Sequence, residues 1–268
     1  MNKILSVNNI EYTHTIKSGL FGSLQSFQLG PISFDMHEGE TIAIIGNNGS
    51  GKSMLAKALV GAVPLSSGTI DLYNSEASDQ AVQTKIRTRG QDIRLILQHN
   101  ADALNPSLSI GSILTQTLSL NTDFGEAQKR EKIEETLVKV GLLREHYYYY
   151  RHMLSDGQQQ RIAMARALLL DPKIIVADEP FAALDPSVRS QTINLILKLQ
   201  NELGLGFVFI SHNIGIVRHI SDRVLVIDKG KIIEQGLTSE VFLNPQQPVT
   251  QKLIQSHFSM VEKHFARL

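Results

Sequence analysis

Residues 46–53 carry the clearest chemical pattern in the chain and read Gly-Asn-Asn-Gly-Ser-Gly-Lys-Ser. They match the phosphate-binding pattern G-x-x-x-x-G-K-[ST] at every fixed position. In such a loop, backbone N–H groups and the positive end of the following helix surround an anion. We expect Lys52 to reach the β- and γ-phosphates of a nucleotide and Ser53 to offer its hydroxyl to Mg²⁺. The nucleotide-binding residues expected here are Gly46, Asn47, Asn48, Gly49, Ser50, Gly51, Lys52, Ser53 and Met54.

Two adjacent carboxylates, Asp178 and Glu179, follow the apolar stretch 174–177. Polar groups at the carboxyl end of a buried strand lie where α/β sheets bind their ligands. We expect Asp178 to hold Mg²⁺ through a coordinated water and Glu179 to polarise the attacking water as general base. The alternative is a surface pair that caps a helix. Together with the phosphate loop, the pair predicts nucleotide hydrolysis.

Strands and helices at suitable places would position these groups. Apolar β-branched runs predict buried strands, and apolar residues at helical spacing predict amphipathic helices. A long helical stretch interrupts the strand–helix alternation, so we expect an inserted helical subdomain. The expected strands are 4–12, 28–36, 41–45, 67–72, 93–97, 173–177, 206–210, 223–227 and 231–235; the helices are 52–63, several within about 99–170, 187–202 and the tail from 237; residues 17–26 are expected to be a flexible hairpin connection.

The composition narrows the class of protein. The chain has 268 residues, of which 42% are hydrophobic, so it can bury a substantial core. Its formal net charge is zero, which gives no electrostatic case for nucleic acid as a partner. It contains no cysteine, which excludes disulfides and thiolate metal sites. No apolar run approaches a signal peptide or a membrane span, so we expect a cytosolic protein that could dock on a membrane partner.

Further motifs identify a family. The stretch Leu154-Ser155-Asp156-Gly157-Gln158 resembles the Leu-Ser-Gly-Gly-Gln signature of ATP-binding cassette (ABC) ATPases. Gln98 matches that family's Q-loop glutamine, Asp185 its D-loop aspartate and His212 its switch histidine. With the phosphate loop and the carboxylate pair, six elements follow one another in the family's order. The resemblance implies an α/β fold: a P-loop NTPase (RecA-like) core with an N-terminal antiparallel β subdomain and an inserted α-helical signature subdomain.

The resemblance also implies a division of the chain and of the work. Residues 1–236 would form the nucleotide-binding domain, with the helical subdomain at about 99–168, and residues 237–268 a C-terminal helical tail. Two such domains would close head to tail around two ATP molecules. Each site would take its catalytic Glu179, His212 and Gln98 and its metal-binding Ser53, Gln98 and Asp178 from one chain. The other chain would supply the signature residues Ser155, Asp156, Gly157 and Gln158.

Two departures from the family pattern have consequences. Asp156 stands in place of the first signature glycine and would bring a carboxylate near a γ-phosphate, which should weaken the partner's site. Alternatively, Asp156 points outward and is tolerated. The family often stacks adenine on an aromatic residue of the first strand, and His14 stands at that position, with Tyr12 on the same strand face. Tyr12 could equally be a core or rim residue.

The branch of the family is indicated by two segments. Asn105-Pro106 and the tail 244–253 resemble elements of the dipeptide/oligopeptide importer ATPases. The resemblance implies, as partners, a second, paralogous ABC ATPase, two integral membrane permease subunits and a periplasmic substrate-binding protein, with no nucleic acid. The chain would then lie at the cytoplasmic face of a bacterial inner membrane and energise peptide transport with ATP and Mg²⁺.

Other functions stay open from the sequence. The cargo could be a polyamine, haem or metal rather than a peptide. A soluble ABC ATPase acting on nucleic acid or the ribosome is a different class, although tandem cassettes, coiled-coil insertions and basic surfaces are absent from this sequence. A regulatory subunit that binds but hardly hydrolyses ATP is a third class, and Glu179 and His212 argue against it.

Overall fold

The computed structural model describes residues 2–17, 24–73, 90–97, 104–181 and 184–265. Its centre is a six-stranded sheet in the order β5-β6-β7-β3-β8-β9. The first five strands in this order run parallel, and β9 pairs antiparallel with β8. The strands are β3 (Thr41–Ile45), β5 (Ile93–Ile96), β6 (Ile174–Asp178), β7 (Gly206–Ile210), β8 (Arg223–Asp228) and β9 (Lys231–Leu237).

Strand β3 lies inside this sheet, between β7 and β8, and all five of its residues are buried. Strand β7 is likewise buried throughout. A parallel sheet that is covered on both faces needs such continuous apolar strands. The carboxyl ends of β3 and β6 meet at the same edge of the sheet, because both strands run parallel to β7 between them. The segments that follow β3 and β6 carry the phosphate loop and Glu179.

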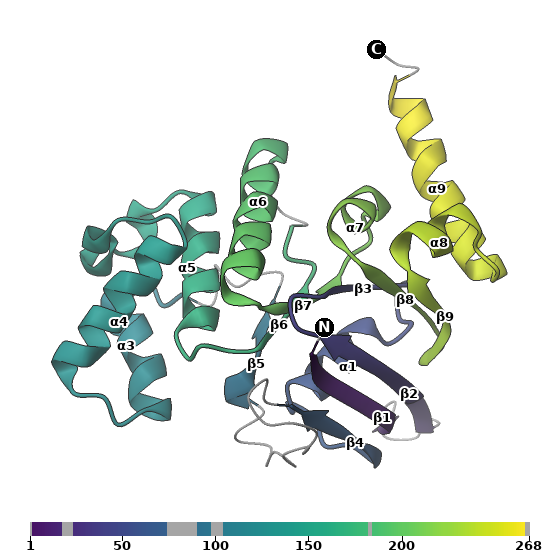
Figure 1. The fold of residues 1–268 in the computed structure, drawn as a ribbon, viewed down its shortest axis with the longest axis horizontal. Coiled ribbons are helices and arrows are strands. Elements are labelled where there is room, and N and C mark those ends of the chain that lie inside the picture. Colours follow the sequence, from purple (N-terminus) through teal and green to yellow (C-terminus); the bar gives the residue numbers. More distant parts are fainter. Residues whose placement is uncertain (1, 18–23, 74–89, 98–103, 182–183, 266–268) are drawn as a thin grey trace.

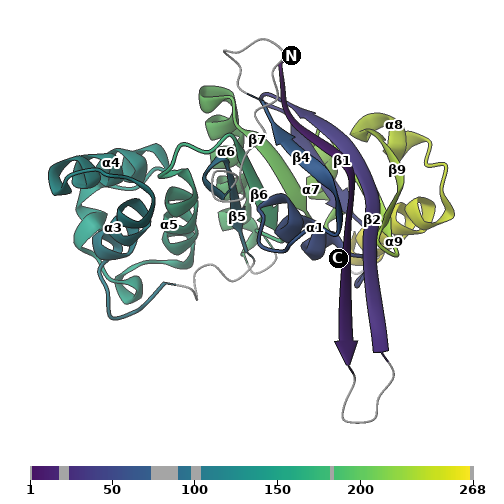
Figure 2. The ribbon, with the colours of Figure 1, turned by 90° about the horizontal axis from the view of Figure 1, so that it is seen from below.

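A second, antiparallel sheet has the order β2-β1-β4, formed by β1 (Lys3–Lys17), β2 (Leu24–His37) and β4 (Ser67–Leu72). Helix α1 (Lys52–Leu59) lies between the two sheets, and Leu55 and Leu59 share one core cluster with apolar residues of both. Figure 2 shows β1 and β2 continuing beyond β4 as a two-stranded ribbon. The predicted flexible connection at 17–26 was therefore wrong at its ends, because paired backbone groups extend the strands to Lys17 and Leu24.

The helical stretch after β5 forms its own group at one side of the molecule (Figure 1). Helices α3 (Ile110–Asn121), α4 (Glu126–Lys139) and α5 (Asp156–Leu168) pack together, with the short 3-10 helices η1 (Arg144–Tyr148) and η2 (Arg151–Met153) leading into α5. Their apolar faces are continuous with the core cluster under α6 and β7. The boundaries assigned to a helical subdomain and to a tail stay predictions.

The remaining helices are α6 (Pro186–Leu203), α7 (Ile214–Ile220), α8 (Thr238–Leu243) and α9 (Pro248–Phe265). The start of α9 is fastened to β9, because Glu234 accepts hydrogen bonds from the backbone N–H groups of Gln246 and Gln247. Within the described ranges, no helix combines the length and the apolar character that a membrane crossing requires. The α/β architecture with an antiparallel second sheet and an inserted helical group confirms the predicted fold class.

Candidate functional site

The phosphate loop leaves β3 after Ile45 and enters α1 at Lys52. Its glycines Gly46, Gly49 and Gly51 have φ values of 154°, 75° and 110°, which residues with a Cβ atom rarely adopt. The loop is anchored from outside, because the Gly230 N–H donates to the Ser50 carbonyl at 2.8 Å. The hydroxyl of Ser50 is buried without a hydrogen-bond partner. These features fit a loop shaped to surround an anion.

Lys52 is held inside this loop. Its side chain is 6% exposed, and its ammonium donates to the carbonyls of Gly46 at 2.9 Å and Asn47 at 2.8 Å. Burial lowers the pKa of Lys52, while the nearby charges of Glu179 and Asp178 act in the opposite direction. The cleft therefore contains a positioned cation that faces two carboxylates.

Glu179 follows directly after β6 and has a φ of 49°, an uncommon conformation for a residue other than glycine. Its backbone N–H donates to the Ile210 carbonyl at 3.0 Å, which ties it to the end of β7. Burial, and secondarily the charge of Asp178, raise the pKa of Glu179 to about 7. A carboxyl group with a pKa near neutrality is suited to general base catalysis.

His212 approaches this carboxyl group, with its Nε2 atom 3.2 Å from Oε1 of Glu179. Oε1 of Glu179 is buried and has no hydrogen-bond partner among the described residues, so this close contact with His212 is the interaction that the structure records for it. Burial, and secondarily the charge of Lys52, lower the pKa of His212. The lowered pKa favours the neutral imidazole, which can accept or donate a hydrogen bond in the cleft.

A cleft of about 450 Å³ brings these groups together. This volume lies in the usual range for small-ligand sites. Nine predicted site residues line it, together with Phe27 and Ile210, which the sequence analysis missed. The nine are Asn48, Gly49, Gly51, Lys52, Ser53, Met54, Asp178, Glu179 and His212.

Phe27 is the more informative of the two missed residues. It lies on β2 beside the phosphate loop, and a Cβ atom added to Gly51 would come within 2.9 Å of its ring. In the register of β1 and β2, Phe27 is the partner of His14, whose side chain lies outside the described residues. Tyr12 is half-buried against the core between the sheets and does not line the cleft. The sequence pattern could not place Phe27 there, because only strand pairing brings it to Gly51.

Other predicted residues lie elsewhere. Gln98 is outside the described residues. Asp185 is the exposed residue that precedes α6. Ser155, Gly157 and Gln158 line a different pocket, of about 430 Å³, at the start of α5. Asp156 is the exposed first residue of that helix. One chain thus places its signature residues in a pocket that shares no lining residue with the phosphate cleft.

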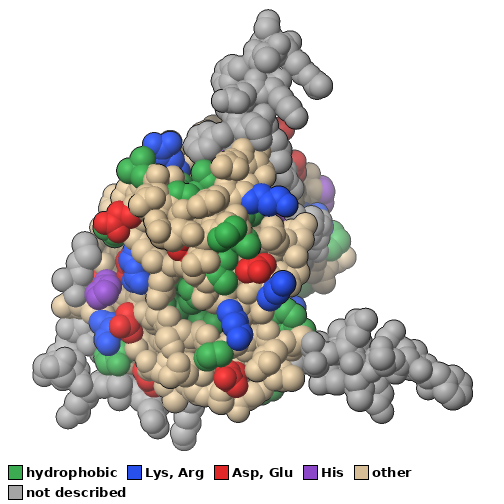
Figure 3. Space-filling model, turned by 90° about the vertical axis from the view of Figure 1, so that its right-hand side faces the viewer, with side chains coloured by type: hydrophobic (Ala, Val, Ile, Leu, Met, Phe, Trp, Pro, Cys, Tyr) green, Lys and Arg blue, Asp and Glu red, His purple; other side chains and the backbone are tan. Residues whose placement is uncertain are grey.

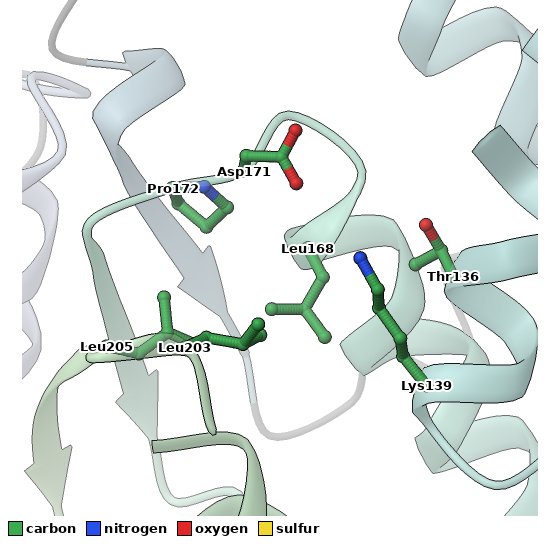
Figure 4. A pocket seen from close by; sticks show the side chains of 7 residues that line it. All are labelled: Thr136, Lys139, Leu168, Asp171, Pro172, Leu203 and Leu205. Atoms are coloured by element: carbon green, nitrogen blue, oxygen red, sulfur yellow. The ribbon is translucent and has the colours of Figure 1, made fainter. Parts of the chain in front are cut away.

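A further, smaller cavity of about 150 Å³ lies between α4, the end of α5 and the end of α6 (Figure 4). Leu168, Leu203 and Leu205 form much of its wall, and Lys139 and Asp171 lie at its margin. It is smaller than the usual ligand site and contains neither glycine loop nor paired carboxylates. It is therefore a poor candidate for the nucleotide.

Comparisons with known proteins agree with this geometry. Residues 29–182 match the ABC transporter family. The putrescine export system ATP-binding protein SapF of Escherichia coli K12 is 44% identical over 257 residues, which cover 95% of this chain and 94% of that protein. The dipeptide transport ATP-binding protein DppF of Haemophilus influenzae is 41% identical over 252 residues, covering 94% of this chain and 77% of that protein.

A solved structure shares the fold. The protein cbiO1 of Clostridium perfringens, part of the ABC transporter complex cbiONQ, superposes with a TM-score of 0.73 at 28% identity, covering 97% of this chain and 99% of that one. The family expected from the signature motif is thereby confirmed, and so are ATP binding and hydrolysis as its activity. This chain belongs to the ABC transporter family, as one of its ATP-binding and ATP-hydrolysing domains.

Proposed function

We propose that this chain is the ATPase subunit that energises a membrane peptide transporter, and that the cleft around Lys52 is its hydrolytic site. The observation that carries the proposal is the meeting of a phosphate loop, a buried cation and a carboxyl group of raised pKa in one cleft. Glu179 accepts a proton from the attacking water, and Lys52 stabilises charge on the β- and γ-phosphates. His212 hydrogen-bonds the γ-phosphate or the water.

The site fits Mg²⁺ as well as ATP. Ser53 and Asp178 both line the cleft, so these two oxygen donors would hold an ion that takes its other ligands from phosphate and water. Gln98 is proposed as a third contributor. Mg²⁺ supplies charge neutralisation on the phosphates when it is bound.

The proposed assembly follows from the separate signature pocket. A second ABC ATPase subunit would place its phosphate cleft against Ser155–Gln158 of this chain, and this chain's cleft would receive the partner's signature. Two membrane permease subunits and a periplasmic binding protein complete the transporter, which puts the chain at the cytoplasmic face of a bacterial inner membrane. On the face shown in Figure 3, acidic and basic side chains are interspersed, which does not favour nucleic acid there.

The cargo has two candidates. A relative that is 41% identical is named for dipeptide transport, and one that is 44% identical is named for putrescine export. Peptides are our first choice, because Asn105-Pro106 and the tail 244–253 resemble the peptide-importer group. The test is ATPase stimulation of the isolated transporter by a peptide library and by putrescine. Stimulation by putrescine alone would replace peptide with polyamine transport.

We expect Phe27 to contact the adenine base. Phe27→Leu should weaken ATP binding by about 1–3 kcal/mol, the usual range for a base stacked on an aromatic ring. Binding of tripolyphosphate, which has no base, should not change, because leucine still packs against Gly51. Calorimetric titration of both ligands checks this, with Phe27→Tyr as a control that keeps the ring. Equal losses for ATP and tripolyphosphate would show that Phe27 only supports the loop.

We expect Asp156 to weaken the partner's site. Asp156 is the exposed first residue of α5. The helix dipole stabilises its carboxylate there, but the carboxylate would repel a phosphate that approaches the same helix end. In a complex carrying Glu179→Gln, the remaining turnover comes from the partner's cleft. Adding Asp156→Gly should raise that turnover about tenfold, equivalent to about 1.4 kcal/mol. No gain over Glu179→Gln alone would mean that Asp156 points away and is tolerated.

A further inference from the structure

Gln160 is a buried polar side chain that the proposed mechanism does not use. It lies in the second turn of α5, the helix that begins with the signature residues, and is 7% exposed. Its amide reaches the segment that follows β6, where Nε2 donates to the Pro180 carbonyl at 3.2 Å. A backbone carbonyl only accepts hydrogen bonds, so the amide NH₂ group must be the part of Gln160 that faces it. Gln160 therefore joins α5 to the residue next to Glu179.

The Pro180 carbonyl depends on this bond. Pro180 is itself buried, and among the described residues Gln160 is the partner that the structure gives to its carbonyl. Leaving a buried carbonyl without a partner is unfavourable, and the loss is avoided only if water or another donor reaches it. Removing the Gln160 amide should therefore release the segment after β6 from α5.

The conformation of Pro180 in turn restricts Glu179. The proline ring fixes the φ of Pro180, and the bond from Gln160 fixes the direction of its carbonyl. Glu179 directly precedes the proline, a place where the ring limits the backbone, and it has a φ of 49°. A residue with a Cβ atom keeps such a conformation only where its surroundings hold it. The position of the Glu179 side chain thus depends on how firmly Pro180 is held.

Two other contacts hold this segment, and both are with β7. The Glu179 backbone N–H donates to the Ile210 carbonyl at 3.0 Å. The Phe181 ring stacks on Phe209 with a centroid separation of 5.7 Å. Gln160 adds a polar contact from α5, so the residues around Glu179 are held by two elements that are distant along the chain.

The contact between Gln160 and Pro180 lies outside the nucleotide cleft. Neither residue lines that cleft, whereas Glu179 does. The phosphate loop, which supplies most of the cleft's polar lining, makes no contact with Gln160 that the structure records among the described residues. Loss of the Gln160 amide should therefore displace the carboxylate and leave nucleotide binding unchanged.

We propose that Gln160 is a positioning residue for the catalytic carboxylate. By bonding to the Pro180 carbonyl, it holds the backbone of Glu179 in the conformation that places its side chain in the cleft. The helix that carries this chain's signature thereby also supports this chain's own hydrolytic site. The effect on turnover rests on the proposed function of Glu179. The hold on the backbone does not, so the two can be tested separately.

The first test is hydrogen exchange of the full chain, followed for single amides by nuclear magnetic resonance. Gln160→Met keeps an unbranched side chain of similar length but removes the donor. The Glu179 N–H should then exchange about tenfold faster relative to the Val176 N–H inside β6, the equivalent of one lost hydrogen bond. An unchanged ratio of the two rates would overturn the proposal.

Gln159→Met is the matched control. Gln159 is the neighbouring residue of α5, is 9% exposed and also donates to a backbone carbonyl, that of Leu154, at 3.0 Å. Its substitution removes a comparable bond that does not involve the segment after β6. The exchange of the Glu179 N–H relative to Val176 should not change in this variant. Equal acceleration in Gln159→Met and Gln160→Met would mean that general loosening of α5, and not the bond to Pro180, is responsible.

The second test is ATP turnover in an assembled transporter whose partner ATPase subunit is inactivated at its own catalytic carboxylate. Gln160→Met should lower kcat about tenfold and leave the Kd for ATP unchanged, because it misplaces the base without touching the phosphate loop. Gln160→Asn, whose amide is one methylene too short to reach Pro180, should do the same and serves if the methionine variant does not fold. Gln159→Met should keep the wild-type kcat.

Two outcomes of the turnover test would refute a positioning role. One is equal kcat values for the Gln160 and Gln159 variants. The other is a loss of ATP affinity as large as the loss of kcat. If the wild type shows no turnover, the proposed function fails, while the exchange test still decides whether Gln160 holds the backbone of Glu179.

Discussion

Replacing Glu179 with glutamine should lower ATP turnover by about 10²- to 10⁴-fold and leave ATP binding intact. Glutamine keeps the size of the side chain but cannot accept a proton from water. The residue's φ of 49° and its backbone bond to Ile210 are also unaffected, so the loss reports chemistry rather than folding. The measurement is kcat, beside the Kd for ATP, in an assembled transporter whose partner ATPase subunit is inactivated at its own catalytic carboxylate, so that only this chain's cleft turns over. A variant that binds ATP normally and turns over at more than a tenth of the wild-type rate would exclude Glu179 as the base.

The raised pKa of Glu179 gives this prediction a pH signature. Since the base must be ionised, kcat/KM should rise with pH to a plateau, with its midpoint near the pKa of about 7. Asp178 supplies part of that shift, so Asp178→Asn should move the midpoint to lower pH. A flat profile between pH 6 and 8 would contradict the assignment. Because Asp178 is also a proposed Mg²⁺-binding residue, we expect its variant to be less active, so the comparison with the wild type uses only the midpoint of the pH profile.

The raised pKa of Glu179 should also make the free energy of unfolding depend on pH. The folded pKa of Glu179 lies above the value of 4.5 for an ordinary glutamate, so the folded state holds the proton more tightly. The free energy of unfolding therefore decreases as pH rises from about 4.5 to 7 and stays reduced above that range. Glu179→Gln should be more stable than the wild type at pH 8, by no more than about 3 kcal/mol, and equal to it at pH 4. Urea unfolding at both pH values measures the difference.

The sequence predicted the cleft well because its parts are local. The glycine loop lies between a strand and a helix, and the carboxylates lie at the end of another strand. The parallel sheet alone brings these two motifs together, because it places the carboxyl ends of its strands at one edge. Nine of the predicted residues line the cleft for that reason. Phe27 could not be predicted, since its place beside Gly51 depends on the register of β1 and β2 and on how that sheet packs over the loop.

The other features that the sequence did not predict also depend on contacts between segments that are distant along the chain. The extension of β1 and β2 into a ribbon was missed because glycines and polar residues near 17–26 are typical of loops, while ladder hydrogen bonds satisfy the backbone whatever the side chains are. Contacts between distant segments are therefore the information that a local pattern lacks.

Two glycines of the phosphate loop should respond differently to alanine. A Cβ atom at Gly46 would lie 2.1 Å from the Ile227 carbonyl oxygen, on the backbone of β8, which cannot move away without breaking the sheet. At Gly49, no atom lies within 4 Å of such a Cβ, and only the φ of 75° opposes the substitution. Gly46→Ala should therefore lower the free energy of unfolding by more than about 3 kcal/mol, and Gly49→Ala by about 1 kcal/mol.

Comparing the Gly46→Ala and Gly49→Ala variants distinguishes two reasons for glycine in the phosphate loop: close contact with the fold and close approach of the nucleotide. Gly46 is a fixed position of the G-x-x-x-x-G-K-[ST] pattern. The fold leaves no room for a side chain there, because the loop passes directly against β8. Gly49 occupies a variable position of the pattern but lines the cleft, so its alanine variant should fold and bind ATP more weakly as the new methyl group intrudes on the phosphate cradle. Thermal unfolding and ATP titration of both variants provide the measurement. Equal destabilisation of the two would mean that backbone conformation alone, and not the contact with Ile227, requires glycine at position 46.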